Sequence, residues 1–348
     1  MAAYQKLAAR YPNSENRADA LYNVAVVLEN TQQYEDAART YRQYASDFSK
    51  REDAPEVFFR SALVYEKMKD YPRMVSTLEA FIRNYRRDGD QKERIVLAHR
   101  KIGDAKKELG ELREADRAYA SCLSEFQSSR LSIKSRAGTD AANCSFERAE
   151  GLFRQYDSMK IEGRGARQVK ALQAKAEAQR AVEKAYKDVF EFKRVETTLA
   201  ASYRIGHSYE RFAESLFTAP IPEEFANDEE LAMEYKQQLE ERAAVLERKA
   251  EAAYRTAYEE AKRTRVSNQW TQRTLEGLNK YAPKDFPIQK QGKPALQTFV
   301  ISGRGIDDGA AARSQAREED SKDIPAPAEI SSPLRQTPGA APPGGGSR

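Results

Sequence analysis

Apolar residues recur at helical spacing through most of the chain, and three segments share one pattern. These segments run from 34 to 48, from 71 to 85 and from 112 to 126, which gives repeat periods of 37 and 41 residues. Their large apolar side chains fall into three columns: Tyr41, Leu78 and Tyr119; Tyr44, Phe81 and Cys122; Phe48, Tyr85 and Phe126. Self-similarity at this period predicts an all-α solenoid, in which each helical unit buries its apolar face against its neighbours.

A second helical pattern precedes each segment, so the repeating unit is predicted to be a helical hairpin. In each unit a small residue of the first helix lies 12 positions before a small or medium-sized residue of the second. These pairs are Ala25 and Ala37, Ala62 and Met74, and Gly103 and Ala115. Small side chains are needed where two helix axes approach closely, which explains the pairing. Tyr4, Leu7 and Tyr11 lie one period before the first column, and we expect them to form the second helix of a unit whose first helix is missing.

This pattern resembles the tetratricopeptide repeat, whose units carry small residues where the helices meet and an aromatic residue on each helix. The similarity covers roughly residues 1–280, and the matching aromatic residues are Tyr65 and Tyr209 on first helices and Tyr41, Tyr119 and Tyr254 on second helices. The extended connection at 11–14 is similar to that of bacterial cell-envelope members, such as the lipoprotein subunit of the outer-membrane assembly machine and the Tol–Pal coordinator. The resemblance implies a helical solenoid of this repeat type that binds other proteins.

Beyond residue 130 the repeat is stretched by an insertion. Gly206 and Ala250 match the small-residue pair of a regular unit, yet 44 positions separate them instead of 12, so 32 residues are inserted. Pro220 and Pro222 mark the turn of this hairpin, because proline cannot continue a helix. Both helices are expected to extend past the solenoid by ~15 residues, or ~22 Å. The insertion is therefore expected to lie outside the packed repeat.

A fourth unit is expected to have its first helix near 136–158 and its second helix at 180–192. Ala142 and Ala181 are assigned to its small-residue positions, and another insertion is expected around 158–168. The sequence therefore predicts two elongated helical hairpins. Together with the segment at 268–287 that follows them, these hairpins also look similar to large repeat proteins associated with bacterial gliding motility.

The end of the chain is predicted to hold a terminal helix and a disordered tail. Residues 268–287 have a helical pattern whose apolar side would cover the last hairpin: Trp270, Leu275, Leu278 and Tyr281. Residues from about 290 onward have few large apolar side chains and are rich in Pro and Gly, a composition that cannot bury enough surface to fold. We therefore divide the chain into regular repeats, units with extended hairpins and a capping helix, and a disordered tail, at 1–130, 131–283 and 284–348.

The composition of the chain mainly excludes classes of function. The 348 residues carry 58 Lys and Arg against 54 Asp and Glu, a net charge of +4 that is spread along the chain. A nucleic-acid-binding protein usually has a clustered basic face, so no nucleic-acid partner is expected. There is no run of ~18 apolar residues that could span a membrane, and residues 1–30 lack a signal-peptide pattern.

Neither catalytic nor cofactor-binding motifs are present. The short glycine segments at 163–167 and 302–305 are interpreted as loops. Two cysteines and two histidines do not have the usual spacing of zinc ligands. We expect no enzymatic activity, no cofactor and no metal site. His99 is expected to face a neighbouring helix in the core.

The resemblance also implies a concave groove lined by the first helices. Its groove-facing positions correspond to Tyr22, Val26, Phe59, Leu63, Arg100, Asp104, Tyr203 and His207. Chaperone adaptors with this repeat hold a peptide carboxylate with Lys and Asn, and aromatic and aliphatic residues stand at those positions here, so that mode of binding is not expected. This strip of aromatic and aliphatic residues along the groove suits an amphipathic helix or an extended peptide as the bound partner. Alternatively, segments of the chain itself fill the strip, and His207 is an ordinary half-exposed helix residue.

Two further features bear on partners and compartment. On the long hairpin, Phe225, Met233 and Leu246 lie off the stripes that would join its two helices, which indicates a docking site on the arm. Cys122 and Cys144 fall on neighbouring helices, where they could form a disulfide in the periplasm or remain reduced in the cytosol. Packing as small buried thiols is the simpler expectation.

Together these features predict a non-enzymatic protein–protein interaction scaffold. The resemblance places it in a bacterial cell-envelope complex for motility, assembly or secretion, in the periplasm or at the outer membrane. The alternatives are a cytoplasmic adaptor and the C-terminal scaffold of a larger enzyme or regulator.

Overall fold

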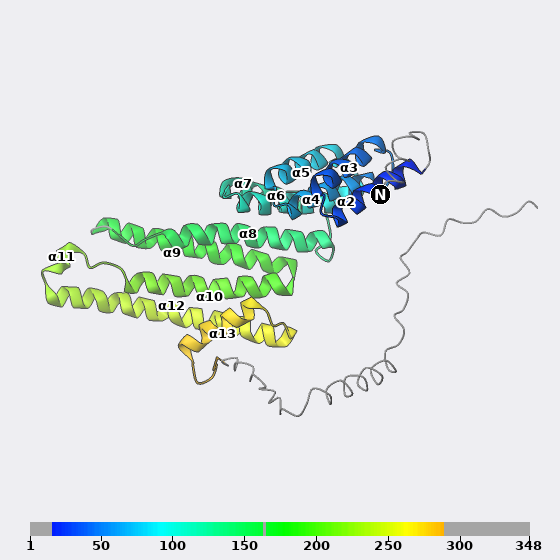
Figure 1. The fold of residues 1–348 in the computed structure, drawn as a ribbon. Coiled ribbons are helices and arrows are strands. Elements are labelled where there is room, and N and C mark those ends of the chain that lie inside the picture. Colours follow the sequence, from blue (N-terminus) through cyan, green and yellow to red (C-terminus); the bar gives the residue numbers. More distant parts are fainter. Residues whose placement is uncertain (1–15, 163–164, 289–348) are drawn as a thin grey trace, which may run out of the picture. The chain divides into compact units, whose positions relative to one another are not determined.

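The computed structural model in Figure 1 describes residues 16–162 and 165–288, and every regular element in these ranges is helical. All of these described residues belong to one compact unit. No helix in the described ranges combines the length and apolar character needed to cross a membrane. The predictions for Tyr4, Leu7 and Tyr11, and for the tail with its strand-like segment, fall outside the described residues.

Three regular helical hairpins form the first part of this unit, as the repeat predicts. Their turns contain Gln32, Lys69 and Gly110, each with positive φ (61°, 56° and 76°), and these residues are separated by the same 37 and 41 positions as the apolar columns. A left-handed residue of this kind commonly ends a helix. The hairpins are α2 (Arg17–Asn30) with α3 (Tyr34–Asp47), α4 (Ala54–Lys67) with α5 (Tyr71–Tyr85), and α6 (Lys92–Glu108) with α7 (Leu112–Ser128), with the short η1 (Gly89–Gln91) before α6.

Two elongated hairpins and a terminal helix follow, which confirms the predicted architecture. Figure 1 shows the long helices running side by side. The first helix of the fourth unit has the predicted bounds. The elements are α8 (Arg136–Ser158), α9 (Ala166–Asp188), η2 (Val189–Phe192), α10 (Val195–Phe217), α11 (Glu223–Ala226), α12 (Glu229–Thr264) and α13 (Gln269–Tyr281).

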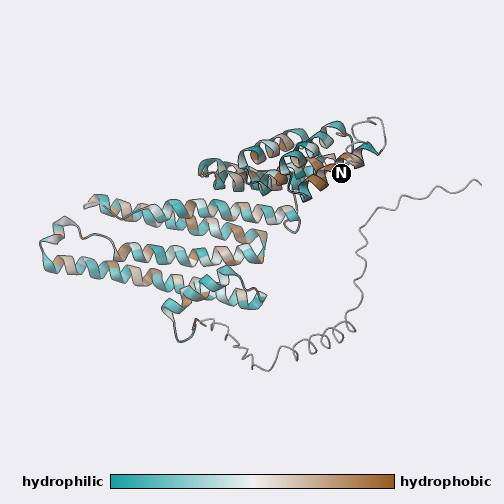
Figure 2. Cartoon of the chain, in the orientation of Figure 1, coloured by the Kyte–Doolittle hydropathy of each residue, from teal (hydrophilic) through white to brown (hydrophobic). Residues whose placement is uncertain are grey.

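Side-chain caps begin several of these helices. The carboxylate of Asp228 accepts hydrogen bonds from the backbone N–H groups of Glu230 and Leu231 at the start of α12, and Asn268 does the same for α13 as part of a capping box. Such caps satisfy backbone donors that have no partner inside the helix. Figure 2 shows hydrophilic and hydrophobic residues mixed along the same helices, as expected where only one face of each helix is buried.

The small first-helix residues make room for aromatic rings. A Cβ added to Gly103 would lie 2.4 Å from the ring of Tyr119, and one added to Gly206 would lie 2.7 Å from the ring of Tyr254. Tyr254 also lies against Gly277 of α13. The glycines were predicted from the close approach of two helices, and the structure shows that the ring of the second helix fills that contact.

The register of α9 was predicted one residue out of place. Ala181 is exposed, whereas Val182 and Tyr186 are 1% and 0% exposed and form part of the core. Val182 and Tyr186 therefore occupy the positions equivalent to Ala115 and Tyr119. Ala142 is buried, as expected.

The long hairpins pack against each other, so the expectation that the inserted arm lies outside the packed repeat is wrong. Phe212, Leu216 and Leu239 of the arm are at most 7% exposed and share a core cluster with Phe153 and Tyr156 of α8. Polar groups join the same two hairpins: Gln168 donates to the carbonyl of Pro220, and Tyr156 donates to the carbonyl of Ser208.

Candidate functional site

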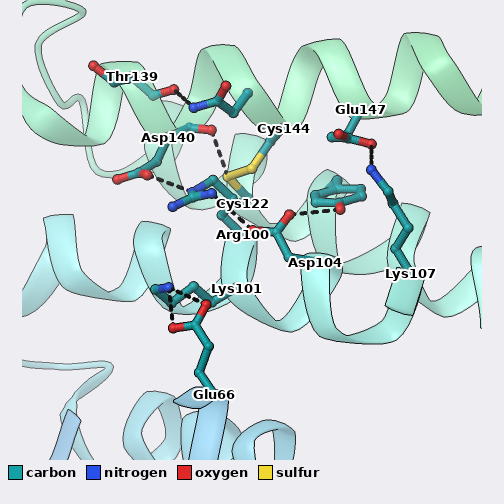
Figure 3. A network of polar contacts seen from close by, with 12 residues as sticks. Glu66, Arg100, Lys101, Asp104, Lys107, Cys122, Thr139, Asp140, Cys144 and Glu147 are labelled. Atoms are coloured by element: carbon teal, nitrogen blue, oxygen red, sulfur yellow. Dashed lines mark hydrogen bonds and ion pairs between the residues drawn. A yellow bond between two sulfur atoms is a disulfide. The ribbon is translucent and has the colours of Figure 1, made fainter. Parts of the chain in front are cut away.

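Ion pairs connect each first helix to the next along the whole described unit. We call them the ion-pair ladder, and Figure 3 shows its middle part around α6 and α8. Most of its N···O distances lie between 2.5 and 3.0 Å. Its members are Glu29 with Arg60 and Lys67, Glu56 with Arg94, Glu66 with Lys101, Arg100 with Asp140, Lys107 with Glu147, Glu150 with Arg204, Asp157 with Arg211, and Glu210 with Lys280.

The ladder has a sequence signal that the repeat analysis missed. Where α6 meets α8 and where α8 meets α10, the ladder charges on each helix lie seven residues apart, which is about two helical turns. In both contacts the facing helix carries two charges of the opposite sign at the same spacing. Examples of these pairs are Arg100 and Lys107, Asp140 and Glu147, Glu150 and Asp157, and Arg204 and Arg211.

In the regular hairpins, the predicted groove residues serve the fold. Phe59 is 5% exposed and its ring lies 5.3 Å from that of Phe81, while the hydroxyl of Tyr22 accepts a hydrogen bond from Arg60. Val26 and Leu63 are partly buried against the same core. At these positions the side chains pack at least partly against the chain's own core.

Arg100 and Asp104 also have partners within the chain. Arg100 binds Asp104 and Asp140 at 2.9 and 2.7 Å, and Asp104 accepts a hydrogen bond from Tyr119. Burial raises the pKa of Asp140 more than Arg100 lowers it. Arg100 and Asp140 belong to the ladder, and Asp104 is held by Arg100 and Tyr119.

Buried tyrosines of the second helices bind first-helix carboxylates in several units. Tyr41 donates to Glu29 at 2.8 Å, Tyr119 to Asp104 at 2.9 Å, and Tyr254 to Glu210 at 2.7 Å. Burial is the main reason that the pKa of each tyrosine is raised, so each remains a donor at neutral pH. The aromatic position predicted from the repeat therefore has a polar role as well as a packing role.

Tyr203 and His207 lie together in a group of rings that we call the aromatic cluster: Phe153, Tyr203, His207 and Trp270. The His207 ring stacks between Tyr203 and Phe153, with centroids 5.6 and 5.5 Å away, and Trp270 of α13 lies 5.8 Å from Tyr203. Tyr203, His207 and Trp270 are partly exposed. The structure thus brings one predicted groove pair together with two residues that were not predicted to join it.

Two arginines lie over the rings of this cluster. The Arg204 guanidinium is 4.9 Å from the centre of the Phe153 ring and 5.6 Å from that of Trp270, and it also pairs with Glu150. Arg273 lies 5.2 Å from the Trp270 ring. Contacts of this kind fix aromatic side chains in place and leave a positive rim.

Glu210 lies beneath the cluster, and its contact with His207 was not predicted. Its carboxylate accepts hydrogen bonds from Tyr254 and Lys280, and His207 Nδ1 lies 3.2 Å from Oε2. Burial alone would raise the pKa of Glu210, but these partners outweigh it and lower the pKa to about 2. Glu210 is three residues after His207, so a carboxylate partner was visible in the sequence.

The three residues predicted for the arm differ in their surroundings. Met233 is 65% exposed, as a docking residue would be. The ring of Phe225 lies 5.8 Å from that of Tyr235, and Leu246 is partly buried against the core of the two long hairpins. The interpretation of Phe225 and Leu246 as residues without an inner face to cover them is therefore wrong.

Cys122 of α7 and Cys144 of α8 form a disulfide, with their Cα atoms 6.6 Å apart (Figure 3). Both residues are fully buried, as expected, but the expectation of reduced thiols is wrong. The described residues contain no group of three His, Cys, Asp or Glu side chains that could hold a metal ion. His99 is half-buried, and burial lowers its pKa.

A known protein family matches two of the regular hairpins. Residues 19–50 and 56–87 match the family model described as "Tetratricopeptide repeat". The TPR2AB domain of yeast Sti1, in a structure titled as a pHSP90 complex, is similar at 12% identity over 87% of this chain and 97% of its own, with a TM-score of 0.33. The C-terminal part of a TPR repeat-containing protein from Cytophaga hutchinsonii has 12% identity over 76% and 96%, with a TM-score of 0.28.

No curated protein sequence matches the chain significantly. The matched residues cover α2 to α5, and the regular turns and tyrosine positions continue the same unit into α6 and α7. The chain therefore contains tetratricopeptide repeats in an all-α solenoid.

Proposed function

We propose that this chain is a scaffold of a bacterial cell-envelope complex and that it holds a peptide or an amphipathic helix of a partner at the aromatic cluster. Tetratricopeptide repeats indicate a protein–protein interaction scaffold. The observation that supports this site is that partly exposed rings of α10 and α13, those of Tyr203, His207 and Trp270, gather on one surface beside the ion-pair ladder. Aromatic and arginine side chains provide much of the binding energy in protein interfaces.

The cluster suits a partner with an apolar side and a negative charge beside it. Three rings offer a rigid apolar surface, since Arg204 and the stacked neighbours hold them in place. Arg273 is exposed at the rim, and no carboxylate among the described residues forms an ion pair with it. We expect the partner segment to place a leucine or an aromatic residue over Trp270 and an acidic residue near Arg273.

The disulfide supports the proposed compartment. Disulfides persist in oxidising compartments such as the bacterial periplasm and are rare in the cytosol. Blocking free thiols in freshly lysed cells, followed by mass spectrometry, should find Cys122 and Cys144 unmodified. Alkylation of both residues would instead favour the cytoplasmic adaptor, or a scaffold attached to a cytoplasmic enzyme or regulator.

A photo-crosslinking amino acid at position 207 tests the site in the native host. Position 39 is the control, because Arg39 is exposed on α3 and is not part of the aromatic cluster. The proposal predicts a crosslink to one segment of one partner from position 207, loss of that crosslink in an R273E variant, and no crosslink from position 39. Equal labelling from both positions would contradict it.

A further inference from the structure

Helix α13 covers the exposed side of the last hairpin for only part of its length. On α10, the residues facing α13 include Tyr203, which contacts Trp270, and Glu210, which binds Lys280 at 2.5 Å. On α12, Tyr254 packs against Gly277 and Tyr281. Helix α13 then ends at Tyr281, while α10 and α12 continue toward the tip of the arm.

The rows covered by α13 continue along both helices at seven-residue spacing. On α10 the row Tyr203 and Glu210 is followed by Phe217. On α12 the row that starts at Tyr254 continues, toward the tip, through Glu247, Glu240 and Met233. Each step of seven residues turns by only about 20° around a straight helix. Phe217, Glu247 and Glu240 therefore stay close to the side on which α13 packs, and Met233 lies about 60° around α12 from Tyr254.

We call Phe217, Met233, Glu240 and Glu247 the terminal face. Phe217 is 52% exposed and Met233 is 65% exposed, which is unusual for large apolar side chains that continue a packed row. Glu240 is exposed and Glu247 partly so, and neither forms an ion pair with a cation in the described ranges. Lys236 is the basic residue on the same side of this part of α12.

Further carboxylates gather where α13 ends. The pKa of Tyr281 is raised by burial and then by the negative charges of Glu210, Glu247 and Glu214. Of these, Glu210 is neutralised by Lys280, and Glu214 is paired with Arg211 on its own helix. The open part of the row therefore presents apolar side chains within a negative field.

We propose that the terminal face binds a basic amphipathic helix from a partner protein, which would lie end to end with α13. Continuity with α13 supports a helix as the occupant, because α13 packs Leu278 into this hairpin and pairs Lys280 with Glu210. From Met233 to Glu247 the face is about 21 Å long, which is room for about 14 helical residues. Two copies joined through this face would bring like charges together, which disfavours a self-contact.

The proposal is separate from binding at the aromatic cluster, because the Glu210–Lys280 pair lies between the two surfaces. Its failure would therefore leave the proposed function standing. A partner could use both surfaces, but neither surface needs the other.

Two synthetic 18-residue amphipathic helices provide a direct probe with the full chain. Both have the same leucine and alanine side, and one carries lysines where the other carries glutamates. Fluorescence anisotropy should show at least about tenfold tighter binding of the basic peptide, since both apolar contact and charge favour it. Equal binding of the two peptides would overturn the proposal.

Matched double variants locate the binding surface. Phe217→Ser with Met233→Ser should weaken binding of the basic peptide by about tenfold or more. Leu231→Ser with Val245→Ser is the control, because these residues are 42% and 45% exposed on another side of α12. Thermal unfolding followed by circular dichroism should be unchanged in both variants. Equal weakening by the control pair would overturn the proposal.

Photo-crosslinking from position 240 in the native host identifies the occupant, with position 245 as the control. A crosslink to a basic amphipathic segment of a different protein supports the proposal. Crosslinks to residues 289–348 of the same chain or to a second copy would overturn it. Crosslinking no stronger than at the control position would also overturn it.

Discussion

The regular hairpins α2 to α7 and the long hairpins α8 to α12 solve the same packing problem differently. In the regular hairpins, apolar columns fill the core and charged residues bridge neighbouring first helices, as Lys101 does with Glu66. The long hairpins keep this scheme near their base and then add a second contact zone. There, apolar residues such as Leu216 and buried polar groups such as Gln168 hold the two arms together.

This difference shows why a long insertion can remain ordered within a repeat array. An inserted hairpin has only one inner face, but a second hairpin of similar length can cover another side. Helices α8, α9 and α10 each have 23 residues, so the arms extend over the same distance. The shared core makes the two long hairpins one cooperative element.

Replacing one buried leucine by alanine in each region should cause the largest loss of stability. Leu78→Ala and Leu216→Ala each remove a side chain that is at most 2% exposed, and each should cost about 2–5 kcal/mol. Hydrogen exchange should accelerate in the regular hairpins for Leu78→Ala and in α8 to α12 for Leu216→Ala, since repeats interact with their neighbours. Faster exchange confined to α10 and α12 in the second variant would mean that the arms are not one element.

The Glu210 carboxylate should make the long region sensitive to acid. Its pKa is lowered to about 2 from the ordinary value of 4.5, so its stabilisation is fully present above about pH 5 and is lost as the pH falls toward 2. A shift of this size corresponds to about 3 kcal/mol. Urea unfolding followed by Trp270 fluorescence should show this loss.

Glu210→Gln tests the assignment of that acid sensitivity. The variant should be less stable than the wild type at pH 7 and should lose less stability between pH 5 and pH 3. Parallel curves for the two proteins over this range would show that other carboxylates cause the effect.

Removing the disulfide should weaken the junction between the two regions. The pair Cys122 and Cys144 closes a loop with a sequence separation of 22, for which loop entropy gives about 3 kcal/mol. We expect Cys122→Ala with Cys144→Ala to lower the free energy of unfolding by about that amount. Equal melting temperatures for the oxidised wild type and the double variant would contradict this expectation.

The ion-pair ladder should give the smallest effect for any one member. A double-mutant cycle on Lys101→Ala and Glu66→Ala should yield a coupling of about 0.2–1 kcal/mol, because the pair is partly exposed to water. The same cycle on Arg39 and Asp36, an exposed pair on one helix, is the control. Coupling above about 2 kcal/mol would show that the ladder is a main source of stability.

The sequence was sufficient to predict the hairpins because aromatic columns repeat in the regular units. It failed by one residue in α9, where alanines at 176, 178, 181 and 185 fit several registers. Alanine buries little surface, so it distinguishes registers poorly, and Tyr186 is the residue that fixes the position. The packing of the arms was missed because it depends on contacts between segments more than 50 residues apart, such as Tyr156 with Ser208.

The candidate site was only partly predictable for a related reason. A repeat pattern predicts which side of the helix a residue lies on. It does not predict whether another residue of the chain already binds that side chain. Tyr22 and Arg100 are bound by the chain's own Arg60 and Asp140. The cluster at Tyr203 depends on Trp270, which comes from a helix outside the regular repeat.

The ion-pair ladder has a consequence for how such an array can evolve. Helix α6 presents positive charges to both α4 and α8, while α8 presents negative charges to both α6 and α10. An internal duplication of the α6–α7 hairpin would therefore set Arg100 and Lys107 against the Arg94 and Lys101 of the new copy. Because like charges would then meet along that contact, electrostatic repulsion would disfavour a duplication of this particular hairpin.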